Sequence, residues 1–219
     1  MKTSLERVTA GAVVLGLALL AEPAAAQPRV QRPARPPTPA PAAGEQVRIR
    51  KLQGLGTRSL VKTPEYRHSL SPGVNRPGDW VEVKLTFDTT PEWIDELTVQ
   101  FFVLTETRLQ GKPEYTLFRR TVRCTDVERG ENHMVAVYLP PNIVRRRGMP
   151  VAVGAEVSIG GKPAAVEGDS EKTLKLQAEW WKSPVVTESK DVAIRDDALL
   201  AREQSPFALV AIDDYEGSR

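Results

Sequence analysis

The sequence is poor in the residues that most often build metal and redox centres. It has one cysteine, Cys124, and two histidines, His68 and His133, among 219 residues. A lone cysteine excludes an intrachain disulfide, and two distant histidines lack the close spacing of metal ligands. We therefore expect no metal and no cofactor, and a domain that folds on its hydrophobic core alone.

An excess of charge of one sign is also missing. The chain has 30 lysines and arginines and 28 aspartates and glutamates, which leaves a net charge of +2. Nucleic-acid-binding domains usually present a strongly basic surface, so we expect no nucleic-acid partner. The acidic tail at Asp213, Asp214 and Glu216 could bind Ca²⁺, although a solvated tail is the simpler interpretation.

Familiar catalytic motifs are absent as well. The sequence has neither a Gly-x-Ser-x-Gly nucleophile turn nor a phosphate-binding glycine loop. Cys124 falls in phase with Phe118 and Val122, which indicates a small buried hydrophobic residue. A hydrolase would need His68 or His133 beside Cys124 in a cleft. We expect that the protein is not an enzyme.

Residues 1–26 predict a secretory signal peptide. Lys2 and Arg7 precede an apolar run from Ala10 to Ala21, and an Ala-x-Ala sequence ends at Ala26. The run is shorter than the roughly 20 apolar residues of a membrane-spanning helix. We therefore expect cleavage after Ala26 and no stable membrane span in the mature chain, with an uncleaved anchor as the alternative. The mature chain would be exported to the periplasm, the outer-membrane surface or the medium.

The remaining chain divides into a linker and one domain. Residues 27–44 are dominated by proline and alanine and carry almost no apolar bulk, which is typical of an extended, stiff spacer. Residues 45–219 contain the alternating apolar patterns and are expected to form a single folded domain.

Two alternating stretches predict the fold of that domain. Apolar residues occupy every second position before and after a corner at residues 88–93: Val81, Val83, Leu85 and Phe87, then Leu97, Val99, Phe101 and Val103. A period of two is the pattern of half-buried antiparallel strands. Further short strands follow at hairpin spacing, separated by Gly, Pro and Asn turns. The sequence therefore predicts an all-β, immunoglobulin-like antiparallel β-sandwich.

Less regular segments predict one or two short helices. Residues 142–147, followed by Gly148, suggest one helical turn, and residues 196–203 suggest a second. Alternation in residues 174–180 and 206–212 predicts two more strands.

Five residues are candidates for surface contact. In a strand, Trp180 and Trp181 would face opposite sides, so one ring could remain exposed as a flat apolar contact, although packing of Trp181 under a loop is the alternative. Trp80 lies out of phase with the core residues of its strand. Arg145, Arg146 and Arg147 form a basic cluster that could meet an anionic partner, or simply be solvated.

Two segments carry a family resemblance. Residues 79–104 (DWVEVKLTFDTTPEWIDELTVQFFVL) and residues 202–216 (REQSPFALVAIDDYE) resemble the pilus-associated immunoglobulin-like proteins of Verrucomicrobia. The resemblance implies an exported immunoglobulin-like sandwich, similar to archaeal pilin domains, that is linked to type IV pilus or cell-envelope assembly and has no catalytic residues. The chain lacks an ordinary prepilin cleavage motif, which favours an accessory component over a major pilin subunit.

Two functions remain open from the sequence. The first is an exported, non-enzymatic interaction or structural protein whose partners are other envelope or pilus proteins, reached through sheet edges or an aromatic patch. The alternative is a carbohydrate- or mucin-binding β-sandwich module that uses Trp80, Trp93 or Trp181 to stack on sugar rings.

Overall fold

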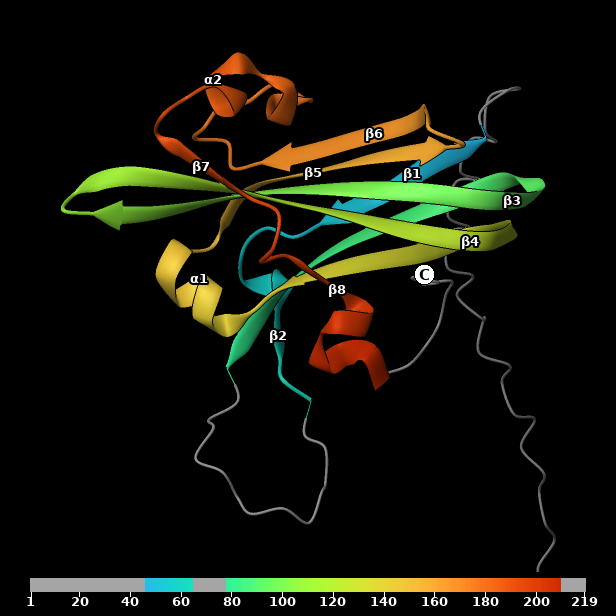
Figure 1. Ribbon diagram of the computed structural model, residues 1–219, viewed down its shortest axis with the longest axis horizontal. Helices are drawn as coiled ribbons and strands as arrows, with labels where there is room; N and C mark the ends of the chain where they lie inside the picture. Colours follow the sequence, from blue (N-terminus) through green and yellow to red (C-terminus); the bar gives the residue numbers. More distant parts are fainter. Residues whose placement is uncertain (1–45, 65–77, 210–219) are drawn as a thin grey trace, which may run out of the picture. The chain divides into compact units, whose positions relative to one another are not determined.

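The computed structural model describes residues 46–64 and 78–209, and these residues form an all-β, sandwich-like fold (Figure 1). The strands are β1 (Val47–Gln53), β2 (Leu60–Lys62), β3 (Asp79–Leu109), β4 (Lys112–Leu139), β5 (Pro150–Ile159), β6 (Lys162–Ser170), β7 (Val192–Arg195) and β8 (Leu200–Ala201). The helices are α1 (Pro141–Arg147) and α2 (Pro184–Thr187), with 3-10 turns η1 (Thr57–Ser59), η2 (Trp180–Lys182), η3 (Arg202–Gln204) and η4 (Pro206–Leu209). The predicted fold class is confirmed.

One long hairpin, formed by β3 and β4, is the centre of the sheet, and every other strand except β6 pairs with it. β3 and β4 pair along their length, and the two-residue turn at Gln110 and Gly111 joins them with positive φ angles of 52° and 83°. The sheet runs in the order β6-β5-β3-β4-β7, while β1 and β2 pair with the first part of β3 and β8 pairs with the last part of β4. The β4–β7 pairing is parallel, and the other pairings are antiparallel.

The hairpin doubles back on itself at a corner (Figure 1). The sequence predicted a break at residues 88–93, but in the structure this corner lies inside the single strand β3. The register between β3 and β4 shifts there, between Phe87 and Thr89 and again between Thr89 and Trp93. Such irregularities sharpen the bend of a strand. As a result, each strand contributes one half to each of two facing layers.

The core lies between these two layers. The eight alternating residues predicted from the sequence are at most 1% exposed and belong to one buried cluster: Val81, Val83, Leu85, Phe87, Leu97, Val99, Phe101 and Val103. A fully buried side chain of this kind contributes about 1.5–3 kcal/mol through removal of apolar surface from water. The core phases of both stretches are therefore confirmed.

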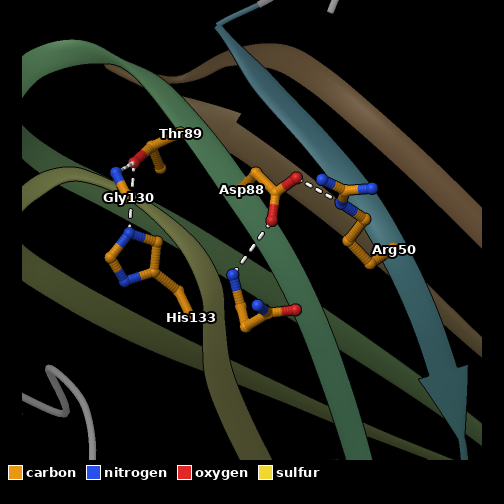
Figure 2. A network of polar contacts seen from close by, with 6 residues as sticks. Arg50, Asp88, Thr89, Gly130 and His133 are labelled. Atoms are coloured by element: carbon orange, nitrogen blue, oxygen red, sulfur yellow. Dashed lines mark hydrogen bonds and ion pairs between the residues drawn. The ribbon is translucent and has the colours of Figure 1, made fainter. Parts of the chain in front are cut away.

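Polar side chains hold the corner together (Figure 2). The hydroxyl of Thr89 accepts a hydrogen bond from the Gly130 amide at 3.0 Å, donates to the Glu128 carbonyl at 2.6 Å and lies 3.1 Å from Nε2 of His133. The Thr89 hydroxyl has one proton, which it donates to the Glu128 carbonyl. In the contact between Thr89 and His133, Nε2 of His133 is therefore the donor. Thr89 and His133 are 4% and 7% exposed, so this network replaces water.

Asp88 makes a second set of contacts on the other side of the corner. Its carboxylate forms an ion pair with Arg50 of β1, and its Oδ1 accepts a hydrogen bond from the Asn132 amide at 2.9 Å. Asp88 is 6% exposed. A buried carboxylate is tolerated when it is paired and hydrogen-bonded in this way. The contacts tie β1 to the bend of β3 and β4.

Three other sequence expectations differ from the structure. Residues 174–179 form turns and irregular backbone before η2 instead of a strand, and residues 196–203 form a bend at 196–199, β8 and part of η3 instead of a helix. Residues 206–209 form the 3-10 turn η4 instead of a strand, and the rest of that expected strand lies outside the described residues. The helix predicted before Gly148 is confirmed as α1. Among the described residues, no helix combines the length and apolar character needed to cross a membrane.

Replacing Thr89 with valine tests the corner network. Thr89→Val keeps the shape but leaves the Gly130 amide and the Glu128 carbonyl without this partner, so we expect a loss of about 1–3 kcal/mol in the free energy of unfolding. Urea denaturation followed by tryptophan fluorescence measures it. Thr121→Val, which removes an exposed hydroxyl from β4, is the control and should change stability by less than about 0.5 kcal/mol. Equal stability of both variants would contradict a structural role for the network.

Candidate functional site

Trp181 does not provide the exposed contact that the sequence suggested. It is 3% exposed, and Trp180 beside it is 1% exposed, because residues 174–187 cover the outer face of the layer that contains β5. Trp181 stacks on Phe102 with ring centroids 5.0 Å apart, and the Trp180 ring meets it edge-on at 5.5 Å. The prediction of a surface role for Trp181 is therefore wrong, and the packing alternative is correct.

Two glycines make room for the Trp181 ring. A Cβ atom on Gly154 of β5 would lie 2.3 Å from the ring, and one on Gly168 of β6 would lie 2.9 Å from it. The indole nitrogen donates a hydrogen bond to Glu156 at 2.8 Å, and Lys182 also pairs with Glu156 at 2.7 Å. Hydrogen bonding to Glu156 is the main cause of a raised pKa for the Lys182 ammonium. The ring is thus held by stacking and by polar contacts at its rim.

Trp80 is also buried, at 8% exposure. Its ring meets Phe207 of η4 edge-on with centroids 5.7 Å apart, and Phe207 stacks on Tyr138 at 4.5 Å. The indole nitrogen of Trp80 donates to the Thr63 hydroxyl at 3.0 Å. The out-of-phase position of Trp80 thus marks a second apolar face, covered by the C-terminal turns, and not an open contact surface.

The arginine cluster does contribute to a recess. A hollow of about 270 Å³ lies between α1 and the connection from β7 to β8, and Arg146 and Arg147 line it together with Arg195 at the end of β7. Arg145, adjacent in sequence, does not line it. Positions 142, 143, 146 and 147 share one side of a helix, whereas position 145 is rotated away from them. We call this recess the arginine hollow.

The chemistry of the arginine hollow is cationic with apolar walls. Phe118, Ile143 and Leu200 also line it, and Asp197 is its one acidic side chain. Within the described part of the chain, Arg146, Arg147 and Arg195 form no ion pair. A guanidinium presents a planar fork of donors that matches a carboxylate or phosphate. The hollow can therefore receive an anionic group that is joined to an apolar body.

A second hollow, of about 560 Å³, is lined by another residue of the same connection, Asp196. It is lined by Gln100, Arg119, Arg120, Thr121 and Asp196. Arg119 holds Asp196 through two hydrogen bonds of 2.7 and 2.9 Å, whereas the buried Nε of Arg120 has no hydrogen-bond partner among the described residues. Residues 195–197 thus contribute to two arginine-lined recesses.

No pattern in the sequence pointed to Arg195, Arg119 or Arg120. Arg195 lies far from Arg146 and Arg147 along the chain and reaches them only because β7 runs parallel to β4. Arg119 and Arg120 lie on β4, and Asp196, which lines the second hollow with them, is distant in the sequence. No periodicity links these positions, since their proximity comes from strand pairing across the domain.

The remaining sequence candidates do not form a site. Cys124 is 1% exposed in the core and pairs with Leu97, while His133 pairs with Phe87 at the corner. Neither residue lines the arginine hollow or the second hollow. Among the described residues, no group of three or more His, Cys, Asp or Glu side chains could hold a metal. His68 and the acidic tail lie outside the described residues.

Gly154→Ala tests the seat of Trp181. The new methyl group overlaps the indole ring, so we expect a loss of about 1–3 kcal/mol in the free energy of unfolding. In a Trp181→Ala background, Gly154→Ala should lower the free energy of unfolding by much less, because the indole ring that the new methyl group would overlap is absent. Urea denaturation of the four proteins in this cycle measures the coupling. An equal cost of Gly154→Ala in both backgrounds would show that the ring does not occupy this seat.

The Arg119–Asp196 pair makes a testable prediction about pH. The hydrogen bonds from Arg119 lower the pKa of the Asp196 carboxyl, and the same bonds raise the pKa of Arg119. The pair therefore stabilises the folded chain above the unfolded pKa of Asp196, and this contribution is lost as pH falls through the lower folded pKa. Because the side chains are 40% and 63% exposed, the energy is small.

An NMR titration of the Asp196 carboxyl carbon measures this effect directly. We expect a midpoint below the ordinary aspartate value in the native chain and a higher midpoint in Arg119→Gln. Arg123→Gln, on the same strand, is the control and should leave the midpoint unchanged. A midpoint that does not respond to Arg119→Gln would show that the pair does not form in solution.

Comparisons with known proteins agree with this architecture. A crystal structure of a protein from Akkermansia muciniphila, one of the Verrucomicrobia, matches with a TM-score of 0.63 and 21% sequence identity, over 80% of this chain and 93% of that chain. At this identity the likeness shows the fold alone. A search of the curated proteins finds no match. A family model matches residues 40–219, well over half of the chain, and the protein therefore belongs to the family that this model defines.

Proposed function

We propose that this protein is an exported, non-enzymatic interaction protein of the cell envelope, associated with type IV pilus or envelope assembly. Its partners are other envelope or pilus proteins. The observation that carries the proposal is the arginine hollow, which offers three guanidinium groups without ion-pair partners among the described residues beside apolar side chains. The predicted signal peptide and the resemblance of residues 79–104 to pilus-associated proteins support the location.

The arginine hollow suits an acidic segment of a partner protein. Arg146 and Arg147 approach from α1 and Arg195 from β7, so a carboxylate between them meets donors from two elements. Phe118 and Leu200 supply apolar surface for the residue that carries or follows the carboxylate. Asp197, the one acidic residue that lines the hollow, disfavours a partner with an extended negative charge, which adds selectivity. A few well-placed contacts of this kind can dominate an interface.

The open edge of β4 offers a second point of contact beside the hollows. Between its pairing with β7 at residues 115–118 and with β8 at residues 137–138, β4 pairs only with β3 among the described strands. Arg119, Arg123 and Glu128 on this stretch discourage indiscriminate strand pairing. An acidic strand of matching charge could add to it while reaching Arg120 in the second hollow. The aromatic patch near Trp181 is not available for this purpose because it is buried.

Charge reversal in the arginine hollow tests the proposed function. A photo-reactive amino acid at Asn142, which also lines the hollow, should form adducts with an acidic envelope or pilus protein in living cells. The combined change Arg146→Glu, Arg147→Glu and Arg195→Glu should reduce adduct formation about tenfold or more, because each reversed charge now repels the partner. Binding of the purified partner should also weaken as salt concentration rises.

Arg145→Glu is the matched control. It reverses a neighbouring exposed charge that does not line the hollow, so it should leave the adducts intact. Circular dichroism of each variant verifies the fold. Cytoplasmic retention of the wild-type chain, or adducts that persist in the triple variant and vanish in Arg145→Glu, would contradict the proposal.

A further inference from the structure

Trp93 differs from the other tryptophans of the chain because its side chain is exposed to solvent. It is 55% exposed, whereas Trp80, Trp180 and Trp181 are at most 8% exposed. Of the three tryptophans considered for a sugar-binding surface, Trp80 and Trp181 are buried and only Trp93 is accessible to a ligand. An exposed indole presents a rigid apolar face at little cost in side-chain entropy.

The corner of β3 determines where this ring lies. The register between β3 and β4 shifts between Thr89 and Trp93, and regular pairing resumes at Trp93 with Glu128. The next residue, Ile94, is 4% exposed and packs in the core, so Trp93 is directed to the opposite side of the strand. Irregularities of this type re-aim side chains at functional places. The ring is thus anchored by the paired residues on its C-terminal side.

A groove of about 300 Å³ adjoins the ring. Pro91, Ile94 and Ile159 contribute apolar surface, and Gln46, Asp95 and Glu96 contribute an amide and two carboxylates. This volume is at the lower end of the range for small-molecule pockets, which is about 300–1,000 Å³. An apolar lining with a few polar groups is also the usual composition of such pockets. The groove therefore has room for about one ring of a ligand.

The charges of the groove restrict its ligand further. Asp95 and Glu96 form no ion pair within the described part of the chain, and no lysine or arginine lines the groove. Carboxylates are strong acceptors for hydroxyl donors and repel other anions. A lysine ammonium could pair with the carboxylates, but its flexible aliphatic stem has no flat face to stack on the indole ring. A ligand with several hydroxyl groups and an apolar ring face fits better.

We infer that the groove beside Trp93 binds a neutral sugar ring. The pyranose face stacks on the Trp93 indole, and the sugar hydroxyls donate hydrogen bonds to Asp95 and Glu96, with the Gln46 amide available to a further hydroxyl. Acidic sugars are excluded by the two carboxylates. This surface involves none of the residues of the arginine hollow, so the site goes beyond the proposed protein contact and does not depend on it.

Saturation-transfer NMR on the exported chain tests the inference. The probes are methyl glycosides of neutral hexoses and N-acetylhexosamines, with N-acetylneuraminic acid as the acidic comparison. We expect signals from at least one neutral sugar and none from the acidic one. Trp93→Ala should weaken binding about tenfold or more, because it removes the stacking face. Trp93→Phe should retain part of the affinity for the sugar, because the phenyl ring still offers a smaller stacking face.

Three further variants test whether sugar binding depends on this groove and on its carboxylates. Leu109→Ala removes another apolar side chain, 57% exposed at the hairpin turn, and should leave sugar binding unchanged. The Asp95→Asn, Glu96→Gln double variant should lose affinity for neutral sugars and relax the exclusion of the acidic one. The triple arginine reversal should bind sugars normally. No neutral sugar binding, binding that survives Trp93→Ala, or Trp93-dependent binding of an oligolysine peptide in place of sugars would each overturn the inference.

Discussion

The bend of β3 and β4 at Asp88 and Thr89 is the constraint on which the sandwich depends. Regular strand pairing is interrupted there, so backbone amides that would bond across the hairpin need other partners. The Thr89 hydroxyl and the Asp88 carboxylate supply acceptors for Gly130 and Asn132, and Arg50 neutralises the carboxylate. Asp88 and Thr89 are themselves 6% and 4% exposed, so removing either side chain would leave hydrogen-bonding partners at the corner unsatisfied. The corner is therefore a bend held by polar contacts beside a hydrophobic core.

The doubled hairpin also decides which surfaces remain for binding. Each layer has an apolar outer face, and the turns around Trp181 cover one while the turns around Phe207 cover the other. The recesses lie instead around α1 and the β7–β8 connection, and at the corner beside Trp93. One region is cationic and the other acidic with an aromatic wall, so the two are suited to different ligands. Because the outer faces of both layers are covered, binding is left to these recesses.

Sequence reasoning succeeded where one strand carried the whole signal. The alternation through Phe87 and from Leu97 identified the core correctly because burial on one face repeats with the pleat of a single strand. It failed for Trp181, since the covering role depends on Gly154 and Gly168 in strands that the tryptophan does not belong to. It also failed for residues 196–209, where Leu200 pairs with Tyr138 and Phe207 stacks on the Tyr138 ring, because these tertiary contacts leave no local periodicity. For the candidate site, Arg146 and Arg147 were found as a basic cluster, but Arg195 joins them only through tertiary pairing.

The two-residue turn at Gln110 and Gly111 has a consequence for how faithfully the chain adopts this fold. The alignment that begins at this turn runs from Leu109 opposite Lys112 to Trp93 opposite Glu128, and after two register shifts at the corner the pairing continues to Val81 opposite Leu139. A slip of one residue in the first alignment would send Leu117 inward and Phe118 outward, and a slip in the second would send Tyr138 inward and Val137 outward. A slip that extended to the corner would also carry Gly130 away from Thr89. The hydrogen bond between the Gly130 amide and the Thr89 hydroxyl therefore forms only when the two strands are natively aligned at the corner.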